Sequence, residues 1–243
     1  MVEHAANAAA APPDGLARRA VGVIRAPRET FGRLRARPAW LGISLAVLLV
    51  IGASFLAVSA TEVGRQAALD QSVNRLEAFG FEVDDARYAS LERMTPYYGW
   101  VAAALTITAG PVALFALSGL IFVVVRRAGT GDPAFRQVLA MVAHTGVVFA
   151  LQRVLAVPAL FVTQSISMPT NVASLLPMLE ESSFPARFLG SMDLFTLWWI
   201  VLLGMGIGVM YRRPARRLIL TCCAVYAVSA GVMAAAIVLS GGS

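Results

Sequence analysis

The chain has 243 residues, of which 58% are hydrophobic and 14% are charged, and its mean hydropathy is +0.71. A soluble protein of this size could not cover its surface with so few polar side chains, so this composition excludes a disordered chain, a disulfide scaffold and an ordinary soluble enzyme. The net charge is +6, and all 20 lysine or arginine positions are arginine. These arginines flank apolar stretches, which indicates contact with anionic lipid rather than nucleic acid.

The N-terminal region divides into two parts before the first apolar stretch. Residues 1–15 are rich in alanine and proline, and we expect a disordered tail without a cleavable signal. Residues 16–39 are basic and amphipathic, and Pro27 is placed to begin a second short helix there. We expect this segment to lie flat on the anionic cytoplasmic leaflet, or to act as a simple positively charged anchor. Its arginines, expected to face lipid, are Arg18, Arg19, Arg25, Arg28, Arg33, Arg35 and Arg37.

Five charge-poor stretches are long enough to cross a bilayer, which requires about 20 apolar residues. They cover about residues 40–60, 98–125, 137–161, 191–211 and 218–239. A sixth span would have to follow Arg153, but prolines and polar side chains interrupt that stretch. The sequence therefore predicts an all-α fold, a five-span transmembrane helical bundle over residues 40–243.

The distribution of arginine between the predicted loops indicates the orientation. One side of the membrane receives 14 arginines and the other receives five, together with most of the acidic side chains. Because cytoplasmic loops are enriched in arginine and lysine, the N-terminus is predicted inside and the C-terminus outside. The exclusive use of arginine, with abundant alanine and glycine, favours a bacterial protein, and hence the inner membrane.

The loop of residues 62–96 is predicted to form a helical hairpin outside the membrane. Gly80 is placed to end its first helix. Asp84 or Asp85 is placed to cap the second helix, and Pro96 to end it. We expect this hairpin to be a solvated cap, with a partner-docking surface as the alternative.

Three ionisable side chains fall inside predicted spans, where such groups are costly and mark candidate sites. Arg153 and Asp193 are predicted at a similar depth in the outer third of the membrane, where they could pair. Their role is either a structural ion pair or a substrate or ion site. His144 lies nearer the cytoplasmic face, and we expect it to hydrogen-bond to a neighbouring helix.

Small residues and one proline mark further features of the spans. Gly110 and Pro111 interrupt the long second span, where we predict a helix kink. Small residues at a spacing of four allow helices to approach closely, and we expect packing seams there, within the chain or between copies. The residues of these seams are Gly204 and Gly208 in the fourth span, and Ala227, Gly231 and Ala235 in the fifth.

Recognisable catalytic chemistry is missing from the sequence. It contains no phosphate-binding loop, no nucleophile elbow and no zinc-protease motif. Cys222 and Cys223 are adjacent in an apolar stretch and have no metal-ligand spacing. We therefore expect no catalytic residues, no metal and no cofactor, and predict that the protein is not an enzyme.

Three groups of residues carry a resemblance to a known family. They are Ala26-Pro-Arg-Glu-Thr-Phe31 with Arg37-Pro-Ala-Trp40, then residues 129–144 with His144, and then residues 171–199, which end in Trp198-Trp199. In this order, over about residues 26–211, the sequence resembles the bacterial branch of the Yip-one (Yip1) domain family, the Ypt- or Rab-interacting integral membrane proteins. The resemblance implies a five-span bundle with a cytoplasmic N-terminus. The chain lacks the Asp-Leu-Tyr-Gly-Pro element of eukaryotic members, so the resemblance does not imply a GTPase partner here.

Two functions are compatible with these observations. The first is a non-enzymatic adaptor or membrane-organising factor that binds anionic lipid and other membrane proteins, or its own copies, through its seams. The second is a small transporter, channel or lipid-moving protein that uses the region of Arg153 and Asp193. A polar cavity reaching Arg153 would favour the second function, whereas a dry, paired Arg153 would favour the first.

Overall fold

The computed structural model describes residues 15–127, 133–163, 170–176, 178, 183–212 and 214–239. Within this part of the chain the protein is helical, and its only extended pairing is one isolated bridge between Asn171 and Asp193. Its elements are α2 (Leu16–Arg25), α3 (Pro27–Ala36), α4 (Leu41–Ser59), α5 (Glu62–Ala78), α6 (Asp85–Met94), η1 (Thr95–Tyr97), α7 (Tyr98–Arg127), α8 (Phe135–Thr145), α9 (Val147–Thr163), η2 (Val172–Leu175), α10 (Phe184–Gly190), α11 (Leu194–Tyr211) and α12 (Ala215–Leu239).

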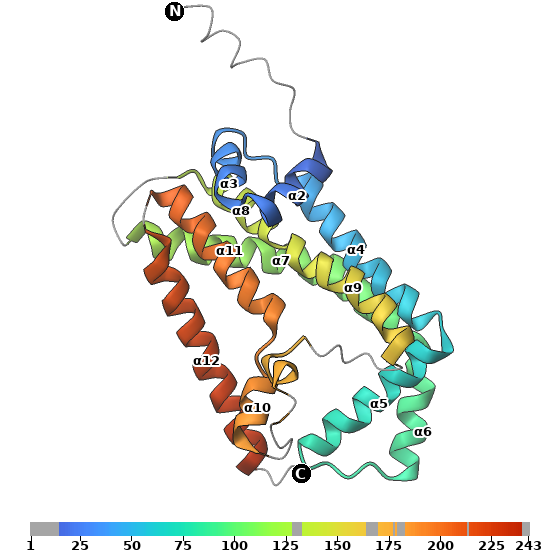
Figure 1. Cartoon of the computed structure of the whole chain (residues 1–243). Coiled ribbons are helices and arrows are strands. Elements are labelled where there is room, and N and C mark those ends of the chain that lie inside the picture. Colours follow the sequence, from blue (N-terminus) through green and yellow to red (C-terminus); the bar gives the residue numbers. More distant parts are fainter. Residues whose placement is uncertain are drawn as a thin grey trace, which may run out of the picture.

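Five helical segments of the described chain are long and apolar enough to cross a membrane. They are α4, α7 with the preceding α6 and η1, α8 with α9, α11, and α12. The all-α, five-span fold class predicted from the sequence is therefore confirmed. Figure 1 shows α2 and α3 at one end of the bundle and α5, α6 and α10 at the other. Most of the predicted tail, residues 1–14, lies outside the described residues.

The helices α2 and α3 pack into the bundle. Val23, Phe31 and Leu34 are buried in a core that includes Met141 of α8 and Met210 of α11. A hydrogen bond from the Gln137 side chain of α8 to the Arg35 carbonyl, 2.6 Å long, fixes the end of α3. The position of this segment relative to the membrane surface stays a prediction, but its apolar side packs against protein. The physical reason is that α8 and α11 offer a complementary apolar surface.

The arginines of this segment divide by exposure. Arg18, Arg25, Arg28 and Arg37 are exposed, whereas Arg19, Arg33 and Arg35 are half-buried. Arg19 donates a hydrogen bond to the Ala39 carbonyl (3.3 Å), and Arg33 forms an ion pair with Glu29 (2.5 Å). The exposed arginines still form a basic surface at the α2–α3 end of the bundle.

The third predicted span is two helices, α8 and α9, which meet at Gly146. Every residue from Val138 to Thr145 is buried, because α8 is surrounded by α2, α3, α4, α7 and α11. A Cβ atom at Gly146 would lie 3.2 Å from the Ala143 carbonyl oxygen and 3.6 Å from Val47 of α4. The break thus lies where α4 approaches closely. The sequence does not reveal the break, because the residues before and after Gly146 are similarly hydrophobic.

The long helix α7 continues through Gly110 and Pro111 without a break. Gly110 lies against α4, since a Cβ atom there would be 2.5 Å from Leu48 Cδ2. The hydroxyl groups of Thr106 and Thr108 donate to the carbonyls one turn earlier, at 2.8 Å each. Gly110 therefore serves the close packing of α4 and α7.

The small residues of α11 and α12 are used for packing within the chain. A Cβ atom at Gly204 would lie 2.4 Å from Cγ1 of Ile219 on α12, and one at Gly206 would lie 2.6 Å from Cγ of Met141. At Gly231 the nearest atoms belong to Phe188 of α10, at 3.7 Å. Gly208 is buried, and Ala227 and Ala235 are half-buried.

These contacts predict different outcomes at the two seams. Gly204→Ala is expected to lower the free energy of unfolding by about 1–2 kcal/mol, because Ile219 must move. Gly231→Ala is expected to be neutral or stabilising by up to about 1 kcal/mol, because alanine is the better helix former and space is present. Equilibrium unfolding in detergent checks both variants. Equal stability of the two variants would contradict this prediction.

The two helices predicted for residues 62–96 are confirmed as α5 and α6, whereas their place outside the membrane stays a prediction. Gly80 adopts a left-handed conformation (φ 77°) two residues after the end of α5, and the Phe81 amide donates to the Leu76 carbonyl at 3.0 Å. Asp84 caps α6, because its side chain accepts a hydrogen bond from the Arg87 amide at 2.8 Å. The helical turn η1 then leads into α7.

Candidate ligand cavity at the end of the bundle

A cavity of about 440 Å³ lies among α4, α5, α7 and α9. Its apolar lining residues include Phe55, Val58, Val157 and Leu160. Its polar lining residues are Ser54 and Ser59 of α4, Gln71, Ser72 and Arg75 of α5, Tyr98 of α7, and Arg153 of α9. Among the described residues that line it, two are cationic and none is acidic. The cavity is therefore an electropositive site whose lining is partly apolar.

Arg153 enters the cavity from α9 and lies on the aromatic ring of Phe55. Its guanidinium carbon is 4.3 Å from the ring centroid, which is the geometry of a cation–π contact. No carboxylate of the described residues lies within ion-pair distance of Arg153. Phe55 precedes the last residue of α4 by four positions, or about 6 Å at 1.5 Å per residue. The charge thus lies about one helical turn inside the end of α4.

The helix α5 supplies the other cation and much of the polar wall. Ala68, Gln71, Ser72 and Arg75 are spaced by three and four residues, which places them on one face of the helix. The Ser72 hydroxyl lies 3.1 Å from the hydroxyl oxygen of Tyr98, and this hydrogen bond joins α5 to the start of α7. Arg75 is exposed, so the cavity reaches the protein surface.

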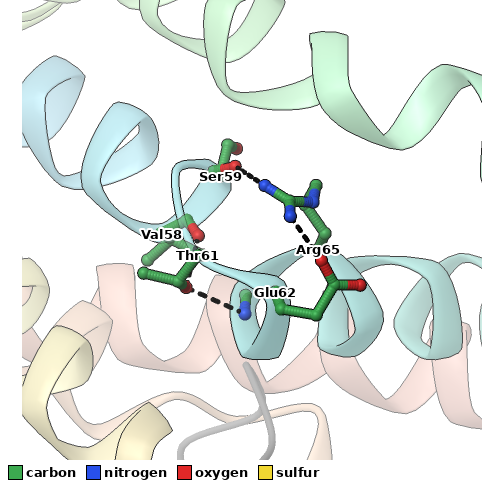
Figure 2. A network of polar contacts seen from close by, with 6 residues as sticks. Val58, Ser59, Thr61, Glu62 and Arg65 are labelled. Carbon is green, nitrogen blue, oxygen red and sulfur yellow. Dashed lines mark hydrogen bonds and ion pairs between the residues drawn. The ribbon is translucent and has the colours of Figure 1, made fainter.

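A tight corner, drawn in Figure 2, joins α4 to α5. The helix α5 forms one wall of the cavity. Thr61 caps α5, because its hydroxyl oxygen accepts a hydrogen bond from the Gly64 amide at 3.1 Å. The same hydroxyl donates to the Val58 carbonyl at 2.9 Å. Figure 2 shows Arg65 reaching back to the Ser59 carbonyl (3.3 Å) and to the Glu62 carboxylate. These bonds join the last turn of α4 to the first turn of α5.

Asp193 belongs to a different site. Its carboxylate caps α11 by accepting hydrogen bonds from the Thr196 amide (2.7 Å) and hydroxyl (3.1 Å). It also accepts from the Thr170 hydroxyl at 2.7 Å and from the Gln152 amide group at 3.1 Å. Its backbone N–H donates to the Tyr226 hydroxyl at 2.9 Å. The structure therefore does not bring Arg153 and Asp193 together as a pair.

The separation of Arg153 from Asp193 follows from the geometry of α9. Gln152 and Arg153 are consecutive, and consecutive side chains on a helix point about 100° apart. Gln152 faces Asp193 at the start of α11, whereas Arg153 faces Phe55 of α4. Counting residues along the spans predicts that Arg153 and Asp193 lie at the same depth in the membrane. It does not predict which side of α9 faces α4 and which side faces α11.

His144 is fully buried in α8, but its observed hydrogen bond stays within that helix. Its Nδ1 atom donates to the Ala140 carbonyl at 2.7 Å, and its Nε2 atom has no hydrogen-bond partner among the described residues. The bond to a neighbouring helix expected for His144 is instead made by the next residue. The Trp199 indole of α11 donates to the Thr145 hydroxyl at 3.1 Å.

Sequence analysis missed most of the cavity. The polar face of α5 carries a helical spacing that could have identified it, but its partners on α7 and α9 lie more than 20 residues away. Cys222 and Cys223 are free thiols, and the described residues contain no group of three or more histidine, cysteine or acidic side chains placed to hold a metal.

Comparisons with known proteins complete the description. Neither the curated proteins nor the solved structures gave a match. The model of the Yip1 domain matches residues 21–237, which include all five candidate spans and the whole cavity lining. The chain therefore belongs to the Yip1 domain family of integral membrane proteins.

Proposed function

We propose that this multi-pass membrane protein is a non-enzymatic binding protein that takes an anionic ligand into the cavity beside Arg153. The observation that carries the proposal is that two cations, Arg75 and Arg153, line the cavity, whereas no described acidic residue does. The volume of about 440 Å³ falls within the range of about 300–1,000 Å³ found for small-molecule sites. The proposal favours the lipid-moving or transport alternative over the adaptor.

The electrostatics of the cavity support an anion. A guanidinium inside a membrane protein is costly to leave without a counter-charge, and Phe55 offsets this cost by only about 0.5–2 kcal/mol. An anionic group bound in the cavity would give Arg153 a counter-charge through charge-assisted hydrogen bonds. Planar guanidinium groups are well suited to phosphate and carboxylate.

The adaptor function has less support from the packing. The seams at Gly204 and Gly231, expected to pack within the chain or between copies, contact Ile219 and Phe188 of the same chain. The exposed arginines of the α2–α3 end support contact with anionic lipid at that end. We place this end in the cytoplasm and the cavity toward the outer face of a bacterial inner membrane.

The decisive variant is Arg153→Gln in detergent-purified protein. Inorganic phosphate and a water-soluble short-chain phosphatidic acid serve as probes, and isothermal titration measures their affinity. Wild type is expected to bind at least one of the probes saturably. Arg153→Gln is expected to bind at least tenfold more weakly, which corresponds to about 1.4 kcal/mol.

Arg93→Gln is the matched control for this experiment. Arg93 lies on α6, outside the described cavity lining, and its side chain donates to the Ala89 carbonyl, one turn earlier in the same helix. Its loss removes the same charge from the same end of the protein, so binding is expected to equal that of wild type. Failure of wild type to bind either probe, or equal loss in both variants, would overturn the proposal.

A further inference from the structure

We infer that the occupant of the cavity is an anionic glycerophospholipid of the surrounding leaflet, held by its phosphate at Arg153 and Arg75 while its acyl chains remain outside, against α7 and α9. This inference rests on the proposed function and adds the class of the ligand and the side from which it enters. Three observations support it, namely the mixed lining, the size of the cavity and the surfaces next to it.

The lining has the chemistry of an amphiphile site. Arg153 and Arg75 provide charge, and the hydroxyl groups of Ser72 and Tyr98 provide further hydrogen bonds. The remaining wall, with Val58, Val157 and Leu160, is apolar. A small hydrated anion would leave this apolar wall without a partner, whereas the glycerol ester region of a lipid would cover it.

The volume sets the part of the lipid that fits. Small-molecule sites range from about 300 to 1,000 Å³, and 440 Å³ lies in the lower part of that range. A headgroup with its phosphate fits a cavity of this size, but two long acyl chains in addition do not. The chains must therefore lie on a surface that continues from the cavity.

Such a surface adjoins the cavity on both α7 and α9. On α7, Val101 and Leu105 follow the lining residues Tyr98 and Ala102 by three positions, and they are 53% and 59% exposed. On α9, Val154 is adjacent to Arg153 and is 55% exposed. Both helices belong to candidate membrane spans, so these exposed apolar side chains face acyl chains rather than water. A lipid can thus reach the arginines without leaving the bilayer.

The test is photocrosslinking of the full chain in nanodiscs. The probe is a phosphatidic acid with a diazirine in one acyl chain, added at a low fraction to phosphatidylcholine nanodiscs, and adducts are mapped by mass spectrometry. Adducts are expected on the exposed face of α7 and α9 beside the cavity, around Val101 and Val154. Arg153→Gln is expected to reduce them at least tenfold, and Arg93→Gln is expected to leave them unchanged.

Two further arms separate this inference from the proposed function. Arg153→Lys keeps the charge and is expected to retain more adducts than Arg153→Gln. This comparison separates loss of the charge from a folding defect in Arg153→Gln. If phosphate in solution binds through Arg153 but the lipid probe gives no adducts there, the lipid assignment is overturned and the anion site stands. If neither the soluble anions nor the lipid binds, both proposals are overturned.

Discussion

Gly64→Ala is expected to lower the free energy of unfolding by about 3 kcal/mol, a large effect for the addition of one methyl group. A Cβ atom at this position would lie 2.0 Å from the carbonyl oxygen of Val58 and 2.7 Å from its carbonyl carbon. Both are backbone atoms, so no side-chain rotation relieves the overlap. The corner between α4 and α5 must open instead, which strains the bonds made by Thr61 and Arg65.

The measurement is equilibrium unfolding in detergent, with Gly119→Ala as the matched control. Gly119 lies within α7, and a Cβ atom there would meet open space, with no neighbouring described atom within 4 Å. That substitution is therefore expected to be neutral or to stabilise by up to about 1 kcal/mol through helix propensity. A Gly64→Ala protein as stable as the control would contradict the described corner. Because α5 forms a wall of the cavity, phosphate binding is also expected to weaken in Gly64→Ala.

Asp193→Ala is expected to destabilise the protein by a similar amount, about 3 kcal/mol. The carboxylate caps α11 and accepts hydrogen bonds from Gln152 and Thr170 as well. Loss of a helix cap costs about 0.5–2 kcal/mol, and hydrogen bonds to a charged group contribute about 1.5–3 kcal/mol. The losses are not additive because the bonds share one acceptor group.

Asp84→Ala is the natural comparison for Asp193→Ala. Asp84 also caps a helix, but it is exposed, and its carboxylate accepts its cap hydrogen bond from the Arg87 amide. Its replacement is expected to cost about 1 kcal/mol. Thermal unfolding in the same detergent ranks the two variants, and the prediction fails if Asp193→Ala is no less stable than Asp84→Ala.

The features that sequence predicted well depend on local chemistry. The first span was expected at 40–60, and α4 covers Leu41–Ser59, because charged residues bound the apolar stretch on both sides. Gly80 and Asp84 were correctly placed at helix ends because a left-handed glycine and an N-terminal aspartate act within a few residues of themselves. The resemblance to the Yip1 domain family was likewise correct.

The features that sequence did not predict depend on which side of a helix meets which neighbour. The spans are apolar all round, so they carry no periodic signal to show that Arg153 faces Phe55 and that Gln152 faces Asp193. The break at Gly146 leaves hydrophobicity unchanged on either side. The cavity combines residues of four helices, and its polar lining becomes a pattern only once those helices are packed.

The burial of Phe31 imposes an order on the biogenesis of this protein. Its ring lies 3.5 Å from the position a Cβ atom would take at Gly206 of α11, and α11 ends at Tyr211, 180 residues further along the chain. At about 5–20 residues per second, the ribosome needs on the order of ten seconds or more to deliver that surface. During this time α3 has made no contact with α11, although α3 is synthesised far earlier. Until the fourth crossing has been inserted, Phe31 lacks the part of its cover that α11 provides.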